Sequence, residues 1–198
     1  MSVAFTDDVD SLRRLLGTAL ETLADARDQR KGPLPDGGPA AIGPLVADGL
    51  GSDLLPERGI GEVSALARVG RTLVAGSADP THPAAAAHLH CPPLALAVAA
   101  ETVAAASNQS VDSWDQGPAA IAIERQVVAT LSGLVGFDPA TSAGVLTTGG
   151  SESNLMGLLL ARDAARRPRV RVLCSRLAHF SIARSAALLG LGEASVVG

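Results

Sequence analysis

The sequence predicts an α/β protein in which an N-terminal helical arm precedes a mainly parallel sheet, and two observations predict it. From Gly144 onward, short apolar runs typical of strands alternate with helical segments of about 10–16 residues, which is the pattern of βαβ units. Before Gly144, apolar residues recur at three- and four-residue spacing, which is typical of amphipathic helices.

Composition narrows the class of protein further. The chain has 198 residues, is 47% hydrophobic and carries a formal net charge of −4, so we expect a helix-rich globular domain with an arm and no nucleic acid as main partner. No apolar run reaches the roughly 18–20 residues of a membrane span, and the N-terminus is acidic where a signal peptide would be basic. We therefore expect a cytoplasmic protein without a membrane partner. Cys91 and Cys174 lie far apart and are predicted to be free thiols.

Apolar spacing predicts four helices in the first two thirds of the chain, at Thr6–Arg30, Glu62–Ala75, Leu94–Ser107 and Pro118–Val135. Four Pro and four Gly predict that Lys31–Pro44 is a linker.

The same apolar pattern predicts which residues cap these helices and which helix faces are buried. Thr6 or Asp7 is available to cap the first helix, whose apolar stripe needs a partner element or subunit. Leu94–Ser107 is almost entirely Ala, Leu and Val, so we expect it to be buried on most sides. In the fourth helix the inward positions are expected to be Ile121, Val127, Val128, Leu131 and Leu134.

The last third alternates strands and helices. We expect a short buried strand ending at Val145–Leu146, a helix at Ser151–Arg166, a strand at Val170–Cys174, a helix at Ser181–Leu189 and a strand at Ser195–Val197. A sheet of two or three parallel strands is too small to cover both of its faces. The chain is therefore expected to be cut off, or to be one part of something larger.

The stretch GVLTTGGSESNLMGLLLA is the strongest candidate for a binding site. A strand, a polar turn at Thr147–Gly150 and a helix start place several backbone N–H groups around one volume, which the helix dipole makes attractive to a phosphate. Gly149 and Gly150 allow positive φ and close backbone approach, while Ser151 is able to cap the helix or donate its hydroxyl. The alternative is that these residues serve only as turn and cap.

His179 follows the predicted strand Val170–Cys174, at the sheet edge where open α/β sheets bind ligands, which is also the edge of the phosphate turn. The alternative is that His179 only caps the next helix. A hydrolase built on Ser151 and His179 is disfavoured, because GGSES lacks the G-x-S-x-G elbow.

Two other polar clusters have weaker interpretations. The spacing of His88 and His90 is compatible with a metal site in which Cys91 or His82 is the third ligand. The alternatives are a polar loop that lines a pocket and ordinary buried histidines. We expect no metal site. A polar loop around Trp114 is either functional or a simple connection between helices.

The run HLHCPPLALAVAAETVAAASNQSVDSWDQGPAAIAIERQVVATLSGLVGFD, followed by GVLTTGGSESNLMGLLLARD, resembles the group II pyridoxal-phosphate-dependent decarboxylases, most of all the L-2,4-diaminobutyrate decarboxylase branch. The resemblance extends from about His82 to Gly198, and Thr6–Ala75 fits the family's helical N-terminal arm more loosely. It implies an arm and loop segment at residues 1–93 and, at 94–198, the truncated first part of a large domain of fold type I.

The resemblance also implies the roles of individual residues and a pyridoxal 5'-phosphate cofactor. Gly150 and Ser151 match the cradle of the cofactor phosphate, and His179 matches the histidine that stacks on the pyridine ring. Asn154, one turn into the cradle helix, supports the phosphate or merely caps. His88 matches a loop position that faces the substrate in relatives.

In the family, a lysine holds the cofactor as a Schiff base, an aspartate pairs with the pyridine nitrogen, and an amino acid loses carbon dioxide to give an amine. Both positions lie beyond Gly198 in the family's order, and the only lysine of this chain, Lys31, matches neither. The resemblance thus implies a partial decarboxylase that acts on an L-amino acid, with L-2,4-diaminobutyrate favoured, as a homodimer or with a complementing C-terminal chain. The alternatives are a non-catalytic remnant that pairs with another subunit and an unrelated phosphate-binding α/β domain.

Overall fold

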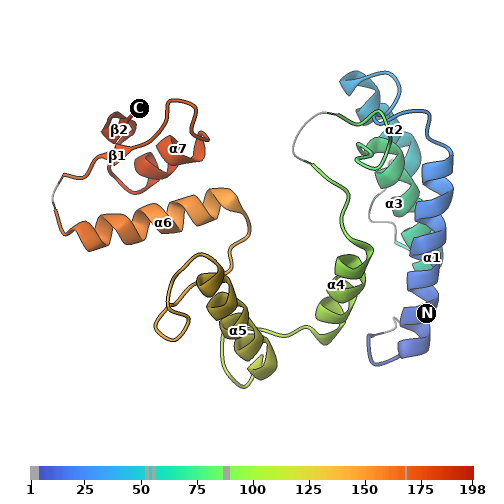
Figure 1. The fold of residues 1–198 in the computed structure, drawn as a ribbon. Helices are drawn as coiled ribbons and strands as arrows, with labels where there is room; N and C mark the ends of the chain where they lie inside the picture. Colours follow the sequence, from blue (N-terminus) through green and yellow to red (C-terminus); the bar gives the residue numbers. More distant parts are fainter. Residues whose placement is uncertain (1–4, 52–53, 55–56, 87–89, 168) are drawn as a thin grey trace. The chain divides into compact units, whose positions relative to one another are not determined.

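The computed structural model describes residues 5–51, 54, 57–86, 90–167 and 169–198, and the chain forms two compact units, residues 1–109 and 110–198 (Figure 1). The first unit contains α1 (Val9–Asp28), α2 (Pro39–Leu50), α3 (Glu62–Gly76) and α4 (Ala95–Ser107). The second contains α5 (Pro118–Leu134), α6 (Gly150–Ala165), β1 (Val172–Leu173), α7 (Ser181–Leu188), the 3₁₀ turn η1 (Glu193–Ser195) and β2 (Val196–Val197). No described helix is long and apolar enough to cross a membrane.

In the first unit, α3 packs against both α1 and α2. The predicted helix Thr6–Arg30 is confirmed as α1, but the expected caps are wrong: Asp8 is the capping residue, and its carboxylate accepts a hydrogen bond from the Ser11 N–H at 3.0 Å. Small side chains fill the contact between helices, since Thr22, Ala26 and Thr72 are the buried residues of α1 and α3.

The predicted linker Lys31–Pro44 is wrong in its second half, because α2 begins at Pro39. Proline at the first helical position loses no intrahelical bond, and only Pro44, inside the helix, removes one. Packing against α3 supports the helix in return. Gly49 lies so close to Thr72 that an added Cβ would meet its side chain, and the Arg68 Nε donates to the Gly49 carbonyl at 2.9 Å.

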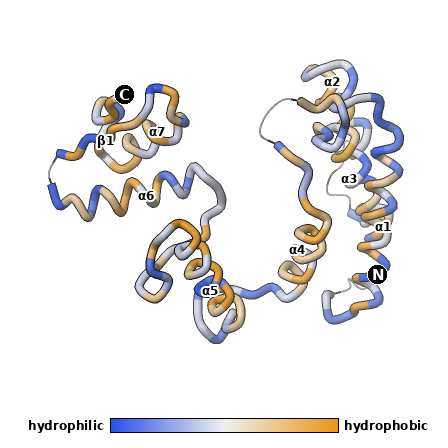
Figure 2. Tube along the Cα trace, viewed as in Figure 1, coloured by the Kyte–Doolittle hydropathy of each residue, from blue (hydrophilic) through white to orange (hydrophobic). Residues whose placement is uncertain are grey.

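The predicted helix Leu94–Ser107 is confirmed as α4, but the expectation that it is buried is wrong. None of its residues is buried, and Leu96 and Val103 are 79% and 70% exposed. Figure 2 shows that α4 is almost uniformly apolar. It shares an apolar cavity of about 590 Å³ with Leu12 and Leu16 of α1. Composition indicates which surface a helix is able to bury, whereas actual burial depends on an element that covers it.

In the second unit, β1 and β2 pair in parallel, with Val172 opposite Val196 and Leu173 opposite Val197. This confirms the two later predicted strands in shortened form. The strand expected to end at Val145–Leu146 is wrong: this segment pairs with no strand of the described chain, and Leu146 donates its N–H to the Glu124 carboxylate at 3.3 Å. A strand requires a neighbouring ladder, which local sequence does not supply.

Helix α5 confirms the prediction at Pro118–Val135, but its expected inward face is only partly right. Ile121 and Val128 are half-buried, and Gly144 lies against Val128. The other three expected inward residues are exposed: Val127, Leu131 and Leu134.

Helices α6 and α7 pack against each other in parallel, with their N-termini at the same end. Near their starts, the Asn154 amide donates to the Ser181 hydroxyl at 2.8 Å. Near their ends, the Arg162 guanidinium of α6 donates to the Leu189 carbonyl, directly after α7, at 3.1 Å. Ser185 and Ala186 are 3% and 0% exposed on α7. The predicted helices Ser151–Arg166 and Ser181–Leu189 are thus confirmed, and together they bring two helix N-termini to one place.

Candidate functional site

The N-terminus of α6 offers unused backbone donors. Gly149 is its N-cap and no side chain caps the helix, so the first N–H groups, beginning with those of Gly150 and Ser151, have no acceptor within the helix. Of the two roles considered for Ser151, that of capping residue is wrong, since Gly149 is the N-cap and Ser151 lies inside the first turn. Gly149 has an extended φ of 162°, so the expected positive φ is not used here. An added Cβ at Gly149 or Gly150 would meet nothing within 4 Å, which leaves the donors open to a ligand.

Side chains of the first residues of α6 hold the preceding turn in place. The Glu152 carboxylate accepts hydrogen bonds from the Thr148 N–H at 2.8 Å and from the Thr148 hydroxyl at 2.5 Å. These bonds stabilise the ionised carboxylate and lower the pKa of Glu152 below its ordinary value. The Thr147 and Ser153 hydroxyls are 2.6 Å apart. The turn is therefore held by Glu152 and Ser153 of α6, while the N–H groups of Gly150 and Ser151 remain for an anion.

His179 lies two residues before Ser181, where α7 begins. Its Nδ1 lies 2.9 Å from the Ser181 hydroxyl and accepts the Ser181 N–H at 3.3 Å, so His179 does bond to the first turn of this helix, as the capping alternative expects. The Phe180 ring lies beside the imidazole, with centroids 4.2 Å apart and planes tilted by 36°. The Arg184 guanidinium lies 4.8 Å from the Phe180 ring centroid. Phe180 therefore supports the imidazole from one side, and Arg184 supports Phe180.

Asn154 joins the two helix starts through Ser181. Its amide nitrogen donates to the Ser181 hydroxyl, which in turn lies within hydrogen-bond distance of His179 Nδ1. The structure thus links Asn154 to His179, and it places Gly150 and Ser151 one turn before Asn154 on the same helix. A contact between Asn154 and a phosphate stays a prediction.

Sequence reasoning missed Ser181. The signal was present, because a serine two residues after a histidine at a helix start is placed to bond the imidazole, but only the packing of α6 on α7 shows that Asn154 completes the chain of bonds.

The remaining predicted site residues contribute less. His88 lies outside the described residues, so the structure does not place it. Within the described ranges, no three His, Cys, Asp or Glu side chains gather as metal ligands would. Cys91 and Cys174 form no disulfide, as expected.

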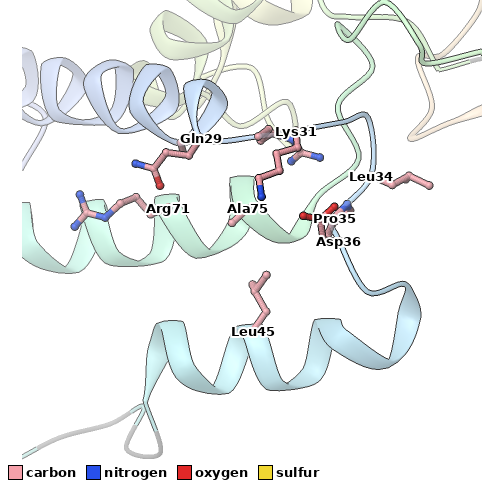
Figure 3. A pocket seen from close by; sticks show the side chains of 10 residues that line it. Gln29, Lys31, Leu34, Pro35, Asp36, Leu45, Arg71 and Ala75 are labelled. Carbon is pink, nitrogen blue, oxygen red and sulfur yellow. The ribbon is translucent and has the colours of Figure 1, made fainter.

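Each unit has a cavity near polar groups, but only one touches the predicted site. In the second unit, a cavity of about 460 Å³ is lined by Cys174, Ser175, His179 and Phe180. In the first unit, a cavity of about 310 Å³ is lined by residues that include Arg30, Lys31, Asp36 and Arg71 (Figure 3). Arg30 donates there to the backbone carbonyls of Val74 and Pro33, which is a structural role at the end of α3.

A parallel β1–β2 pair, two converging helix N-termini and a histidine after β1 lie together in the second unit, and helix N-termini at the carboxyl ends of parallel strands are where open α/β sheets bind phosphate-bearing ligands. Residues 60–196 match the pyridoxal-dependent decarboxylase conserved domain, and the chain belongs to that family. The resemblance and the pyridoxal phosphate cofactor predicted from sequence are thereby confirmed at the level of the family. The open backbone donors at Gly150 and Ser151 fit the phosphate of such a cofactor.

Among its relatives are two L-2,4-diaminobutyrate decarboxylases. The chain is 47% identical over 149 residues to that of Rhizobium meliloti (strain 1021), covering 73% of this chain and 30% of the relative. It is 38% identical over 164 residues to that of Acinetobacter baumannii, covering 71% of this chain and 32% of the relative. The chain therefore spans about a third of the length of these curated relatives.

A solved structure supports the same relationship. The glutamate decarboxylase domain of diaminobutyrate-pyruvate transaminase and L-2,4-diaminobutyrate decarboxylase from Vibrio parahaemolyticus superposes with a TM-score of 0.83 at 31% identity, covering 94% of this chain and 43% of that one. The largely helical chain with its small parallel sheet is thus similar to part of a decarboxylase domain.

Proposed function

We propose that this chain supplies the phosphate-binding and ring-covering part of a pyridoxal-phosphate-dependent decarboxylase, which converts an L-amino acid to the amine and carbon dioxide. The observation that carries the proposal is the parallel packing of α6 and α7, which brings two positive helix ends together beside His179. A fold type I domain, a division near residue 93, a homodimeric or complemented assembly and a cytoplasmic location belong to the same proposal.

Each residue of the site has a defined task in this proposal. The N–H groups of Gly150 and Ser151, with the Ser151 hydroxyl, bind the phosphate. The His179 imidazole covers one face of the pyridine ring and keeps water from it. When bound, pyridoxal phosphate supplies the electron sink that accepts the pair left at Cα as carbon dioxide departs. His88 is proposed to face the substrate.

The proposed substrate is L-2,4-diaminobutyrate, on the support of the two relatives that carry that name.

The alternative, a part without activity of its own, is favoured by one observation. Lys31 is the only lysine in the 198 residues, it is exposed, and it lies outside residues 60–196. We therefore propose that activity requires a lysine supplied by further chain or by a partner.

A chimera tests the activity. The matched segment of the Rhizobium meliloti relative is replaced by the corresponding residues of this chain, so that the relative contributes all remaining machinery. The chimera is expected to release carbon dioxide from carboxyl-labelled L-2,4-diaminobutyrate, because the two segments share 47% of their residues. The measurement is trapped radioactive carbon dioxide over time, with carboxyl-labelled L-glutamate and L-cysteine sulfinate assayed in parallel.

Two results would contradict the proposal. A folded chimera that releases carbon dioxide from none of the three amino acids would show that the segment does not support decarboxylation. Release from L-glutamate or L-cysteine sulfinate in preference to L-2,4-diaminobutyrate would keep the reaction and reject the substrate. The unmodified relative is the control for folding and for the assay.

A further inference from the structure

The hydrogen bonds around Ser181 determine which nitrogen of His179 carries the proton. The Ser181 backbone N–H donates to Nδ1 at 3.3 Å, and an N–H group cannot accept, so this contact assigns Nδ1 as the nitrogen without a proton. The Ser181 hydroxyl also lies 2.9 Å from Nδ1, which makes the hydroxyl a donor in that contact. The remaining proton of the ring is then on Nε2.

The donor role of the Ser181 hydroxyl is itself fixed from α6. The Asn154 amide nitrogen donates to the Ser181 oxygen at 2.8 Å, which occupies the oxygen as an acceptor and leaves its single hydrogen for Nδ1. Ser181 is only 2% exposed, so water competes poorly for this hydrogen. The bonds therefore run in one direction, from Asn154 through Ser181 to His179.

We propose that Asn154 and Ser181 are positioning residues that hold His179 as the Nε2–H tautomer and fix the orientation of its ring. Neither contacts the cofactor in this proposal, because both act through the imidazole. This differs from a phosphate-supporting role for Asn154, since its amide is directed at α7. The importance of the tautomer for cofactor binding rests on the proposed function, whereas the tautomer itself does not.

The chain of bonds from Asn154 to His179 depends on the packing of α6 against α7. Ser181 is the first residue of α7 and Asn154 is the fifth of α6, so the bond forms only when the two helix starts lie side by side. Arg162 and Leu189 hold the other ends together at 3.1 Å. The packing of α6 on α7 is thereby coupled to the tautomer and the ring orientation of His179.

Imidazole nitrogen-15 NMR of the intact chain tests the proposal. Spectra recorded near pH 8.5, where an ordinary histidine is neutral, report the ratio of the two tautomers, and His179→Gln identifies the His179 signals. The wild-type chain is expected to show the Nε2–H form in large excess. Ser181→Ala and Asn154→Ala are expected to lower the tautomer ratio about three- to tenfold, the effect of losing one hydrogen bond.

Ser185→Ala is the matched control, because Ser185 is 3% exposed one turn further along the same helix. It removes an equally buried hydroxyl and is expected to leave the tautomer ratio of His179 unchanged. Asn154→Ala also guards against a fold defect in Ser181→Ala, since it breaks the same chain of bonds from the other helix.

A wild-type tautomer ratio in folded Ser181→Ala and Asn154→Ala would overturn the proposal, as would a similar fall in Ser185→Ala. Equilibrium dialysis with pyridoxal phosphate separates this from the proposed function. A changed tautomer with unchanged affinity keeps the positioning role and rejects the stacking role of His179. A changed tautomer with weakened binding supports both.

Discussion

Replacing Ser151 with aspartate is expected to weaken the binding of pyridoxal phosphate to this chain by about thirtyfold. Ser151 lies in the uncapped first turn of α6, so the new carboxylate would stand within a few ångströms of a phosphate bound there. Repulsion of about 1 kcal/mol per unit charge at ~4 Å in water, acting on a dianion, gives about 2 kcal/mol, which is close to that factor. Equilibrium dialysis, read by the absorbance of pyridoxal phosphate, measures the change.

The matched control is Ser64→Asp, which makes the same change of charge in the exposed first turn of α3. This variant is expected to bind pyridoxal phosphate as the wild-type chain does. Pyridoxal, which lacks the phosphate, is expected to bind Ser151→Asp and the wild type alike. Equal affinities of Ser151→Asp and Ser64→Asp for pyridoxal phosphate would show that the phosphate does not bind at α6.

The second large effect is an absence of covalent labelling. Pyridoxal phosphate and borohydride, which together fix the cofactor to an amine, are expected to leave no stoichiometric adduct at a defined residue of this chain. Lys31 is its only lysine, is exposed, and lies outside residues 60–196, which match the family. Peptide mass spectrometry after reduction measures the labelling.

Lys31→Arg provides the control, since it removes the only lysine ε-amine and keeps the charge. The variant is expected to show only low labelling of the N-terminal amine, and the wild type is expected to add sub-stoichiometric labelling of Lys31 that does not saturate with pyridoxal phosphate. Stoichiometric modification of Lys31 that saturates with pyridoxal phosphate would contradict the account, because it would place the cofactor beside a residue of the first unit.

The helices were predictable where the signal is local. Apolar spacing alone places α1, α3, α6 and α7 to within a few residues, because a periodic stripe specifies the helix that buries it. Helix α2 was not predictable in this way, since Pro39 and Pro44 indicate a break, and the helix depends on the close approach of Gly49 to Thr72. Tertiary packing overrides local preference at this point.

Features that depend on a partner were mispredicted for one shared reason. The apolar composition of α4 and of Val145–Leu146 indicates burial, but burial needs another surface, and these segments are exposed in the units described. The alternation of strands and helices predicted the small parallel sheet. Its two strands are shorter than predicted, since only two residues of each strand pair.

The candidate site divides in the same way. The turn at Thr147–Gly150 and His179 were predicted as site residues, because each follows a predicted strand and precedes a helix. The role of Ser181 was not identified, because the bond from Asn154 joins residues 27 positions apart and exists only in the packed helix pair. Residue types and short spacings can be read from a sequence. Whether two such segments lie within hydrogen-bond distance can be read only from the structure.

The central claim is that the N-termini of α6 and α7 together form the binding site of pyridoxal phosphate. A titration of the nitrogen-15-labelled chain with pyridoxal phosphate, followed by amide and imidazole NMR, tests it most directly. We expect the amide signals of Gly150 and Ser151 and the imidazole signals of His179 to shift together and to saturate at one ligand concentration. Signals that stay fixed at these three residues, while those of Lys31 and Arg71 beside the cavity of the first unit move, would contradict it.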